Sequence, residues 1–172
     1  AQYSAYLEQS QLYDLPVATV VGNHDSSSNS YDQHFNVPNE SSLGKTPASA
    51  DYWFRHGNTL FLVLNVNNTS TAEHKAFMED AISKNTDAAW KVVAMHHSVY
   101  SVADHAFDKD ILQRREALVP VFKDLDIDVV LQGHDHVYVR SYMMDDLNPV
   151  TDPAAYDNDE MNSVTNTDDI LY

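Results

Sequence analysis

The sequence predicts an α/β fold, in which short apolar strands alternate with amphipathic helices. Apolar runs of strand length stand at Pro16–Val21, Trp90–Met95 and Val129–Leu131, and each leads within two residues into a glycine or a histidine. Apolar residues recur at helical spacing near residues 70–82 and 109–125. A chain of 172 residues is long enough to build one domain with a buried core.

The first fifty residues predict a helix, a strand and a long loop. Residues 3–13 show a weak helical pattern, and the apolar run Pro16–Val21 is typical of a buried strand. Such a strand would deliver Asn23 and His24 to its carboxyl end. Residues 26–50 are rich in Ser, Asn, Gly and Pro, so we expect a loop that could partly cover the functional site.

A hairpin and a helix are expected next. Tyr52–Phe54 and Thr59–Leu64 are apolar runs separated by a turn that contains Gly57. The segment Ser70–Glu73 matches a capping box, in which serine and glutamate side chains satisfy free amides at the start of a helix. We therefore expect a helix that runs from there through Ile82 with one apolar face.

Two further strands are expected to end close to histidines. Trp90–Met95 leads directly into His96, and Val129–Leu131 leads through a glycine into His134. The helix near residues 109–125 lies between these strands in the sequence. The alternation favours strands that run side by side, with their connecting helices packed on the sheet.

The remainder of the chain predicts a strand, an acidic segment and the beginning of another strand. Val137–Val139 follows His136 directly and is expected to be extended. Residues 143–168 contain acidic but no basic side chains, and predict an acidic, solvated insertion or loop. Ile170–Tyr172 is apolar, as at the start of a strand.

Composition excludes several classes of function. The chain carries 26 acidic and 10 basic side chains, a formal charge of -16, which repels polyanions and argues against a nucleic-acid partner. It has no cysteine, so disulfides and thiolate chemistry are excluded. Its apolar runs are too short to span a membrane, so no membrane partner is expected. A small anionic substrate remains compatible with this charge where metal ions reverse its sign locally.

The residue types at the predicted strand ends point to a metal site. The amide of Asn23 and the imidazoles of His96, His134 and His136 all lie where parallel strands would end. Nitrogen and oxygen donors without thiolates suit zinc, manganese and iron. On an extended backbone, the two histidines of the His-x-His pair would leave the same face and could bind one ion together or two neighbouring ions.

Three segments together resemble a known family. They read Gly22-Asn23-His24-Asp25, Val92-Val93-Ala94-Met95-His96-His97 and Gly133-His134-Asp135-His136-Val137-Tyr138-Val139-Arg140-Ser141. In order and spacing they resemble the last three motifs of the calcineurin-like metallophosphoesterase superfamily, and the third is most similar to the purple acid phosphatase branch. The resemblance covers about residues 15–142 and implies an αββα sandwich, with a mixed sheet flanked by helices.

The resemblance implies a dinuclear metal site. Asn23, His96 and His134 match ligands of the second metal, and His136 matches a ligand of the first. The family uses two divalent or trivalent ions, here iron, zinc or manganese, to activate a hydroxide that hydrolyses a small phosphate ester, either a phosphomonoester or a phosphodiester.

The resemblance also implies catalytic roles. His24 matches the histidine that contacts the phosphate and donates a proton to the leaving group, and Asp25 would orient it and favour its protonated form. His105, on the loop after His96, resembles a phosphate-contacting histidine of the purple acid phosphatases. Members of that branch are typically secreted, so a secreted or extracytoplasmic location is expected.

The family's first two motifs, Asp-x-His and Gly-Asp-x-x-Asp, do not occur before Gly22. They supply most ligands of the first metal and the bridging carboxylate. We therefore expect residues 1–172 to form a single partial domain, truncated rather than degenerate, that binds at most one ion.

Two alternatives stay open. Without the first-metal carboxylates, the chain could be a catalytically incompetent metal-binding or interaction fragment. A serine hydrolase using Ser98 or Ser101 with His97 and an Asp is disfavoured, because the chain lacks a Gly-x-Ser-x-Gly elbow.

Overall fold

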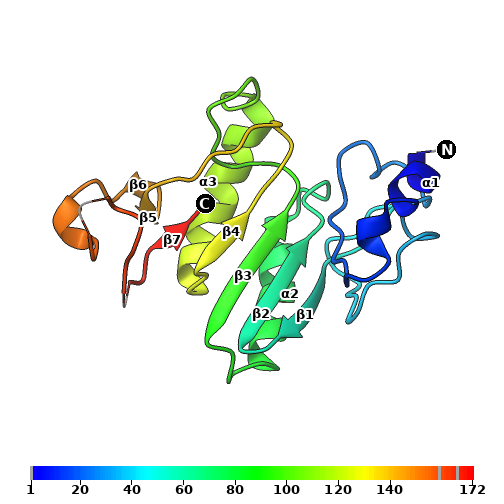
Figure 1. Cartoon of the computed structure of the whole chain (residues 1–172), viewed down its shortest axis with the longest axis horizontal. Coiled ribbons are helices and arrows are strands. Elements are labelled where there is room, and N and C mark those ends of the chain that lie inside the picture. Colours follow the sequence, from blue (N-terminus) through cyan, green and yellow to red (C-terminus); the bar gives the residue numbers. More distant parts are fainter. Residues whose placement is uncertain (1, 159, 166) are drawn as a thin grey trace.

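A computed structural model describes residues 2–158, 160–165 and 167–172 and confirms an α/β fold built on one mixed sheet (Figure 1). The seven strands lie in the order β1-β2-β3-β4-β7-β5-β6. The strands are β1 (Tyr52–His56), β2 (Thr59–Leu64), β3 (Trp90–Met95), β4 (Val129–Leu131), β5 (Met143–Asp145), β6 (Asn148–Pro149) and β7 (Ile170–Leu171). The helices are α1 (Gln2–Leu7), α2 (Thr71–Ser83) and α3 (Lys109–Asp124), with 3-10 turns η1 (Ser10–Leu12) and η2 (Pro153–Ala155). None of the helices in these ranges is long and apolar enough to cross a membrane.

The centre of the sheet consists of parallel strands, whose carboxyl ends therefore meet at one edge. β1 and β2 form the expected antiparallel hairpin, and β2, β3 and β4 pair in parallel. The register places Leu64 opposite Met95 and Ala94 opposite Leu131. The residues that follow β3 and β4, which include His96 and His134, are therefore neighbours in space.

Helices α2 and α3 cover one face of this sheet (Figure 1). Leu60, Leu62 and Val93 point to this face and are fully buried against Phe77 of α2 and Phe122 of α3. Burial of each such side chain contributes about 1.5–3 kcal/mol to stability. This core fixes the strands that carry the site.

Helix α2 begins as the capping box predicts, but only half of the box forms. The Ser70 hydroxyl accepts a hydrogen bond from the Glu73 amide at 3.4 Å. The Glu73 carboxylate does not return to Ser70 but accepts from the amide of Gly44 at 2.9 Å. A hydrogen bond between the loop at residues 26–50 and helix α2 therefore replaces the reciprocal bond of the capping box.

The opposite face of the sheet is less covered. Phe54 and Phe61 stack with ring centroids 4.7 Å apart, and Leu131 is 52% exposed. With Ala18 and Val20, the residues Phe61 and Leu131 help to line a hollow of about 350 Å³ that reaches His96.

The prediction of a strand at Pro16–Val21 is wrong. The segment is extended but pairs with no strand in the part of the chain described, so no backbone ladder forms. Side chains hold its carbonyl groups instead: the Tyr52 hydroxyl donates to the Thr19 carbonyl at 2.7 Å, and the Asn67 amide donates to the Val21 carbonyl at 3.2 Å.

The prediction of a strand at Val137–Val139 is also wrong. Tyr138 is 94% exposed, and these residues pair with no described strand. The backbone enters the left-handed region at His134 (φ 74°) and at His136 (φ 53°). The His-x-His pair is thus not extended, and the same-face geometry expected for it does not apply.

The long loop at residues 26–50 is confirmed and packs beside β1 with α1 (Figure 1). It contains turns but no helix or strand, and Tyr31 and Phe35 pack with Tyr3 in a small aromatic cluster. Apolar side chains within the loop therefore hold it in place.

The acidic segment 143–168 holds more structure than its composition suggested. β5 and β6 form a short hairpin, in which Met143 and Met144 are buried. The strand expected from the apolar run at residues 170–172 forms as β7, and it pairs with β4 on one side and β5 on the other. Residues 159 and 166 of this segment lie outside the described ranges.

Candidate metal centre

Three of the four predicted metal ligands come together at the carboxyl edge of the sheet. The Nε2 atom of His96 lies 3.0 Å from Oδ1 of Asn23 and 3.2 Å from Nδ1 of His134. The rings of the two histidines meet edge to face, with centroids 5.1 Å apart. We call Asn23, His96 and His134 the ligand trio.

Local structure explains why the trio forms. Asn23 lies in a tight turn in which the Asp25 amide donates to the Gly22 carbonyl at 3.1 Å. The Gly133 amide donates to the His96 carbonyl at 3.0 Å, which joins the loops after β3 and β4. A Cβ atom at Gly22 would lie 3.0 Å from an Asp25 carboxylate oxygen and 3.6 Å from the His96 ring. A side chain at position 22 would therefore press on Asp25, whereas its contact with His96 would be of ordinary van der Waals length.

The donor atoms of the trio fit a bound cation. Oδ1 of Asn23 carries lone pairs and no hydrogen, and each neutral imidazole has one nitrogen with a free lone pair. Two ligands of a tetrahedral ion with bonds of about 2.0–2.1 Å lie about 3.3 Å apart, close to the separations in the trio. Within the described residues, no group of three or more His, Cys, Asp or Glu side chains is placed to hold an ion, and the trio has only two such residues.

The electrostatics of the trio favour neutral imidazoles. Burial, and then the nearby His134, lower the pKa of His96. Burial, and then His105, lower the pKa of His134. Neutral imidazole is the form that binds metals, because the free lone pair is the ligand.

His97 is a neutral, buried neighbour of the trio. Its ring centroid lies 4.8 Å from that of His134, and burial lowers its pKa to about 3. Its Nδ1 atom is buried with no hydrogen-bond partner among the described residues. The His97 side chain therefore packs against His134 as an uncharged ring.

The His105 ring also packs against the His134 ring. The two ring centroids are 4.5 Å apart, and the His105 amide donates to the Asp135 carboxylate at 3.3 Å. The His105 ring bonds the Asp108 carboxylate at 2.7 Å, and this bond raises the pKa of His105. The structure thus places an exposed, readily protonated imidazole beside the trio.

Among the described residues, no side-chain hydrogen bond joins the other predicted site residues, His24, Asp25 and His136, to the trio, although the charges of all three influence the pKa of His96. His24 and His136 are exposed, and among the described residues neither makes a hydrogen bond through its ring. Asp25 does not bond His24. Its carboxylate accepts from the Tyr3 hydroxyl at 2.6 Å instead.

Two residues that hold the turn were not foreseen from the sequence. Tyr3, on α1, bonds Asp25, and Asn67, after β2, donates to the carbonyls of Val21 and Gly22. The polar pair Asn65 and Asn67, two residues apart directly after an apolar strand, is the one signal that could have indicated a polar contact there.

Comparison with known proteins identifies the family. A sequence profile described as calcineurin-like phosphoesterase matches residues 1–138, so the chain belongs to that family. The mixed sheet with flanking helices is consistent with the metallophosphoesterase fold. Members of this family usually bind divalent metal ions.

Individual relatives match parts of the chain. Purple acid phosphatase 17 of Arabidopsis thaliana is 33% identical over 67 residues, which are 39% of this chain and 18% of that protein. Two Mycobacterium tuberculosis proteins, uncharacterized protein Rv2577 and uncharacterized protein MT2654, are 26% identical over 140 residues, 71% of this chain and 26% of each relative. The chain thus spans about a quarter or less of the length of these curated relatives.

Proposed function

We propose that the chain carries part of the active site of a metal-dependent phosphoesterase of purple-acid-phosphatase type, acting on small phosphate monoesters or diesters. The observation that carries the proposal is the ligand trio, in which three metal-binding donor atoms from Asn23, His96 and His134 converge within 3.2 Å contacts. The family match supports the reaction class, and the relative named as a purple acid phosphatase supports the branch.

In this proposal each side chain has one role. The trio binds the second metal ion and His136 binds the first. Bound ions, iron, zinc or manganese, would hold phosphate oxygens and lower the pKa of bound water, so that hydroxide forms near neutral pH. His24 donates a proton to the leaving oxygen, and Asp25, held by Tyr3, lies beside it in the turn.

His105 presents a positive charge to the phosphate group of the substrate. Its bond to Asp108 favours the imidazolium form, which attracts the phosphate that the strongly acidic chain would otherwise repel. In this proposal, positive charge at the phosphate site counteracts the repulsion that the net charge of -16 exerts on an anionic substrate.

We propose further that residues 1–172 are part of one phosphoesterase domain, with residues 15–142 bearing the motifs and residues 143–168 an acidic insertion. The Asp-x-His and Gly-Asp-x-x-Asp motifs, supplied elsewhere in a longer protein, complete the two-metal site. The short share of each relative that the chain covers supports this arrangement. The purple acid phosphatase likeness also supports a secreted or extracytoplasmic location, which fractionation of the native protein tests.

The test has two stages. The chain alone, freed of metal and titrated with Zn²⁺ or Mn²⁺ in a calorimeter, should bind at most one ion weakly and hydrolyse a chromogenic phosphomonoester little or not at all. His96→Ala should abolish ion binding, whereas His56→Ala, at the exposed end of β1, should not change it. Two tightly held ions, or brisk turnover by the chain alone, would contradict the proposed division of the site.

The second stage uses the longer protein with the upstream motifs. It should hold two ions, lose activity with a chelator, and lose about 10²–10⁴-fold in rate when His24 becomes alanine. Retained activity after chelation would overturn the proposal.

A second function has an observation in its favour. His136 makes no hydrogen bond to the trio among the described residues, and no group of three or more His, Cys, Asp or Glu side chains there is placed to hold an ion. These features suit a catalytically incompetent metal-binding or interaction fragment. A longer protein that binds one ion and hydrolyses no phosphate ester would establish this alternative.

A further inference from the structure

Asn67, which follows β2, holds the backbone carbonyls at the start of the turn that carries Asn23. The Nδ2 atom of Asn67 lies 3.2 Å from the Val21 carbonyl and 3.4 Å from the Gly22 carbonyl. Both partners only accept hydrogen bonds, so the two carbonyls share one N–H group of the amide, and the other N–H group donates to Asn65. The same Gly22 carbonyl accepts the Asp25 amide that closes the turn.

This contact replaces a missing backbone ladder. Residues 16–22 pair with no strand among the described residues, and a strand in a sheet would have its carbonyls held by a neighbour. At Gly22, directly before Asn23, the Asn67 side chain holds the carbonyl that a neighbouring strand would otherwise hold.

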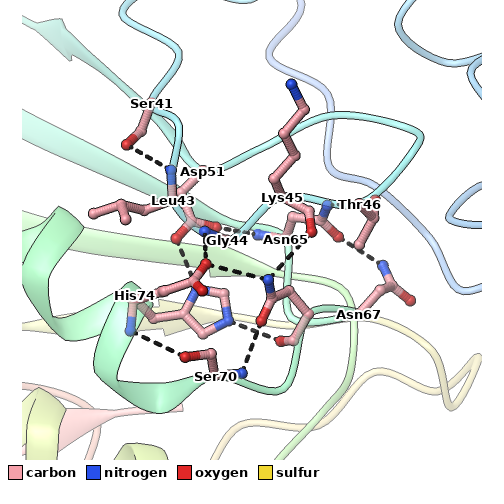
Figure 2. A network of polar contacts seen from close by, with 12 residues as sticks. Ser41, Leu43, Gly44, Lys45, Thr46, Asp51, Asn65, Asn67, Ser70 and His74 are labelled. Carbon is pink, nitrogen blue, oxygen red and sulfur yellow. Dashed lines mark hydrogen bonds and ion pairs between the residues drawn. The ribbon is translucent and has the colours of Figure 1, made fainter.

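Asn67 is itself oriented by a buried network (Figure 2). Its Nδ2 atom also donates to Oδ1 of Asn65 at 3.0 Å, and Asn65 is 2% exposed. The Asn65 amide nitrogen donates to the Ser49 carbonyl and to the Thr46 hydroxyl, each at 2.9 Å. With its amide group fully used, Asn65 cannot rotate without losing buried hydrogen bonds.

The network continues into helix α2. The Asn65 backbone amide donates to Oδ1 of Asp51 at 2.8 Å, and Nδ1 of His74 bonds the other carboxylate oxygen at 2.7 Å. Asp51 is completely buried. Figure 2 shows Asp51 between His74 and Asn65, so a continuous line of hydrogen bonds runs from the helix to the turn at Gly22.

We propose that Asn67 is a positioning residue, which fixes the Gly22 turn and thereby keeps Asn23 beside His96. This inference rests on the proposed function only in assigning a metal to the trio. The contact between Asn23 and His96 can be measured without metal.

The test uses the whole chain in metal-free form and compares Asn67→Ala with the wild type. Amide hydrogen exchange at Asp25 should become about tenfold faster or more, because its partner carbonyl is no longer held. NMR signals of the Asn23 side-chain amide and the His96 ring should shift, whereas the amides of β2 and β3 keep their protection.

Asn85→Ala is the matched control. Asn85 is 6% exposed, and its side chain donates to the Ala81 carbonyl at 2.8 Å. This bond lies at the carboxyl end of α2, whereas Ser70 caps the amino end. Its loss removes a comparable buried bond and should leave Asp25 exchange and the Asn23 signals unchanged. Equal effects of the two variants would show general destabilisation and overturn the positioning role.

Zinc titration separates this inference from the proposed function. If the trio binds zinc, Asn67→Ala should weaken zinc binding by about 10–100-fold. A loss of this size is typical when a residue that positions a metal ligand, without contacting the metal, is removed. A wild-type chain that binds no zinc overturns the metal function, and the metal-free exchange then decides the positioning role alone. Unchanged Asp25 exchange, or unchanged zinc affinity in a wild type that binds zinc, overturns the inference. If Asn67→Ala also speeds hydrogen exchange at the amides of β2 and β3, the milder variant Asn67→Ser is tested in its place. If Asn67→Ser speeds exchange in β2 and β3 too, Asn67 stabilises the fold as a whole and the positioning role is overturned.

Discussion

Nε2 of His96 lies 3.0 Å from Oδ1 of Asn23, although 73 residues separate them in the chain. One residue follows a central strand of the sheet, and the other lies on a turn that no strand supports. The contact therefore joins a rigid element to a segment held by side chains.

The chemistry of this contact can be tested at Asn23. Asn23→Ala removes an oxygen donor and should weaken zinc binding by more than about 100-fold, beyond the loss typical of an outer partner. Asn23→Asp keeps an oxygen at the same place and adds charge, so it should retain binding. Calorimetric titration of both variants measures the difference. Equal affinity of the alanine variant and the wild type would show that Asn23 is not a ligand.

The buried pair of His74 and Asp51 predicts a pH dependence of stability. Burial alone lowers the pKa of His74, but the Asp51 hydrogen bond and charge, the Asn68 carbonyl and the nearby Glu73 outweigh it and raise the pKa. A raised folded-state pKa contributes stability that is complete below the unfolded pKa of about 6.5 and is lost as pH rises through the folded value.

Urea unfolding of the wild type and of His74→Gln across neutral and alkaline pH measures this contribution. The stability difference should be largest at the acidic end and shrink as pH rises. A His74 difference that grows with pH would reverse the assigned sign.

Two glycines with similar backbone angles should tolerate alanine very differently. Gly44 has φ 65° and Gly57 has φ 57°, so alanine at either position costs about 1–2 kcal/mol in backbone strain. A Cβ at Gly44 would also overlap the buried Asp51 carboxylate, at 2.2 Å, whereas nothing lies within 4 Å at Gly57. Gly44→Ala should therefore cost about 1–3 kcal/mol more, measured by urea unfolding. Equal costs would mean that Asp51 moves freely, contrary to its buried network.

The Tyr3 hydroxyl should titrate unusually late. Burial, together with the hydrogen bond to Asp25, raises the pKa of Tyr3 to about 12. Spectrophotometric titration of the wild type and Asp25→Asn, each compared with its Tyr3→Phe counterpart, isolates this group. Its pKa should fall toward 10 in the Asp25→Asn background. An unchanged value would show that the carboxylate does not bond the phenol in solution.

Periodicity predicted the elements that bury a continuous apolar face. β2, β3, α2 and α3 all formed where expected, because their apolar residues meet in one core. The histidines after β3 and β4 were placed correctly for the same reason, since parallel pairing fixes where these strands end.

The incorrect elements share a different physical cause. Pro16–Val21 and Val137–Val139 have strand-like composition, but a strand also needs a backbone partner, and composition does not show whether one is present. The left-handed backbone at His134 and His136 has no signature in a His-Asp-His sequence. The partnership of Tyr3 with Asp25 spans 22 residues and likewise leaves no local pattern.

The partly covered sheet face offers apolar area through which molecules could associate at high concentration. Phe54, Phe61 and Leu131 expose apolar area that favours self-association, while a net charge of -16 keeps molecules apart. Added salt shortens the range of that repulsion to about 8 Å at physiological ionic strength and leaves the short-range attraction in place. Self-association of the chain should therefore increase with ionic strength, and low-salt buffers should favour the dispersed form.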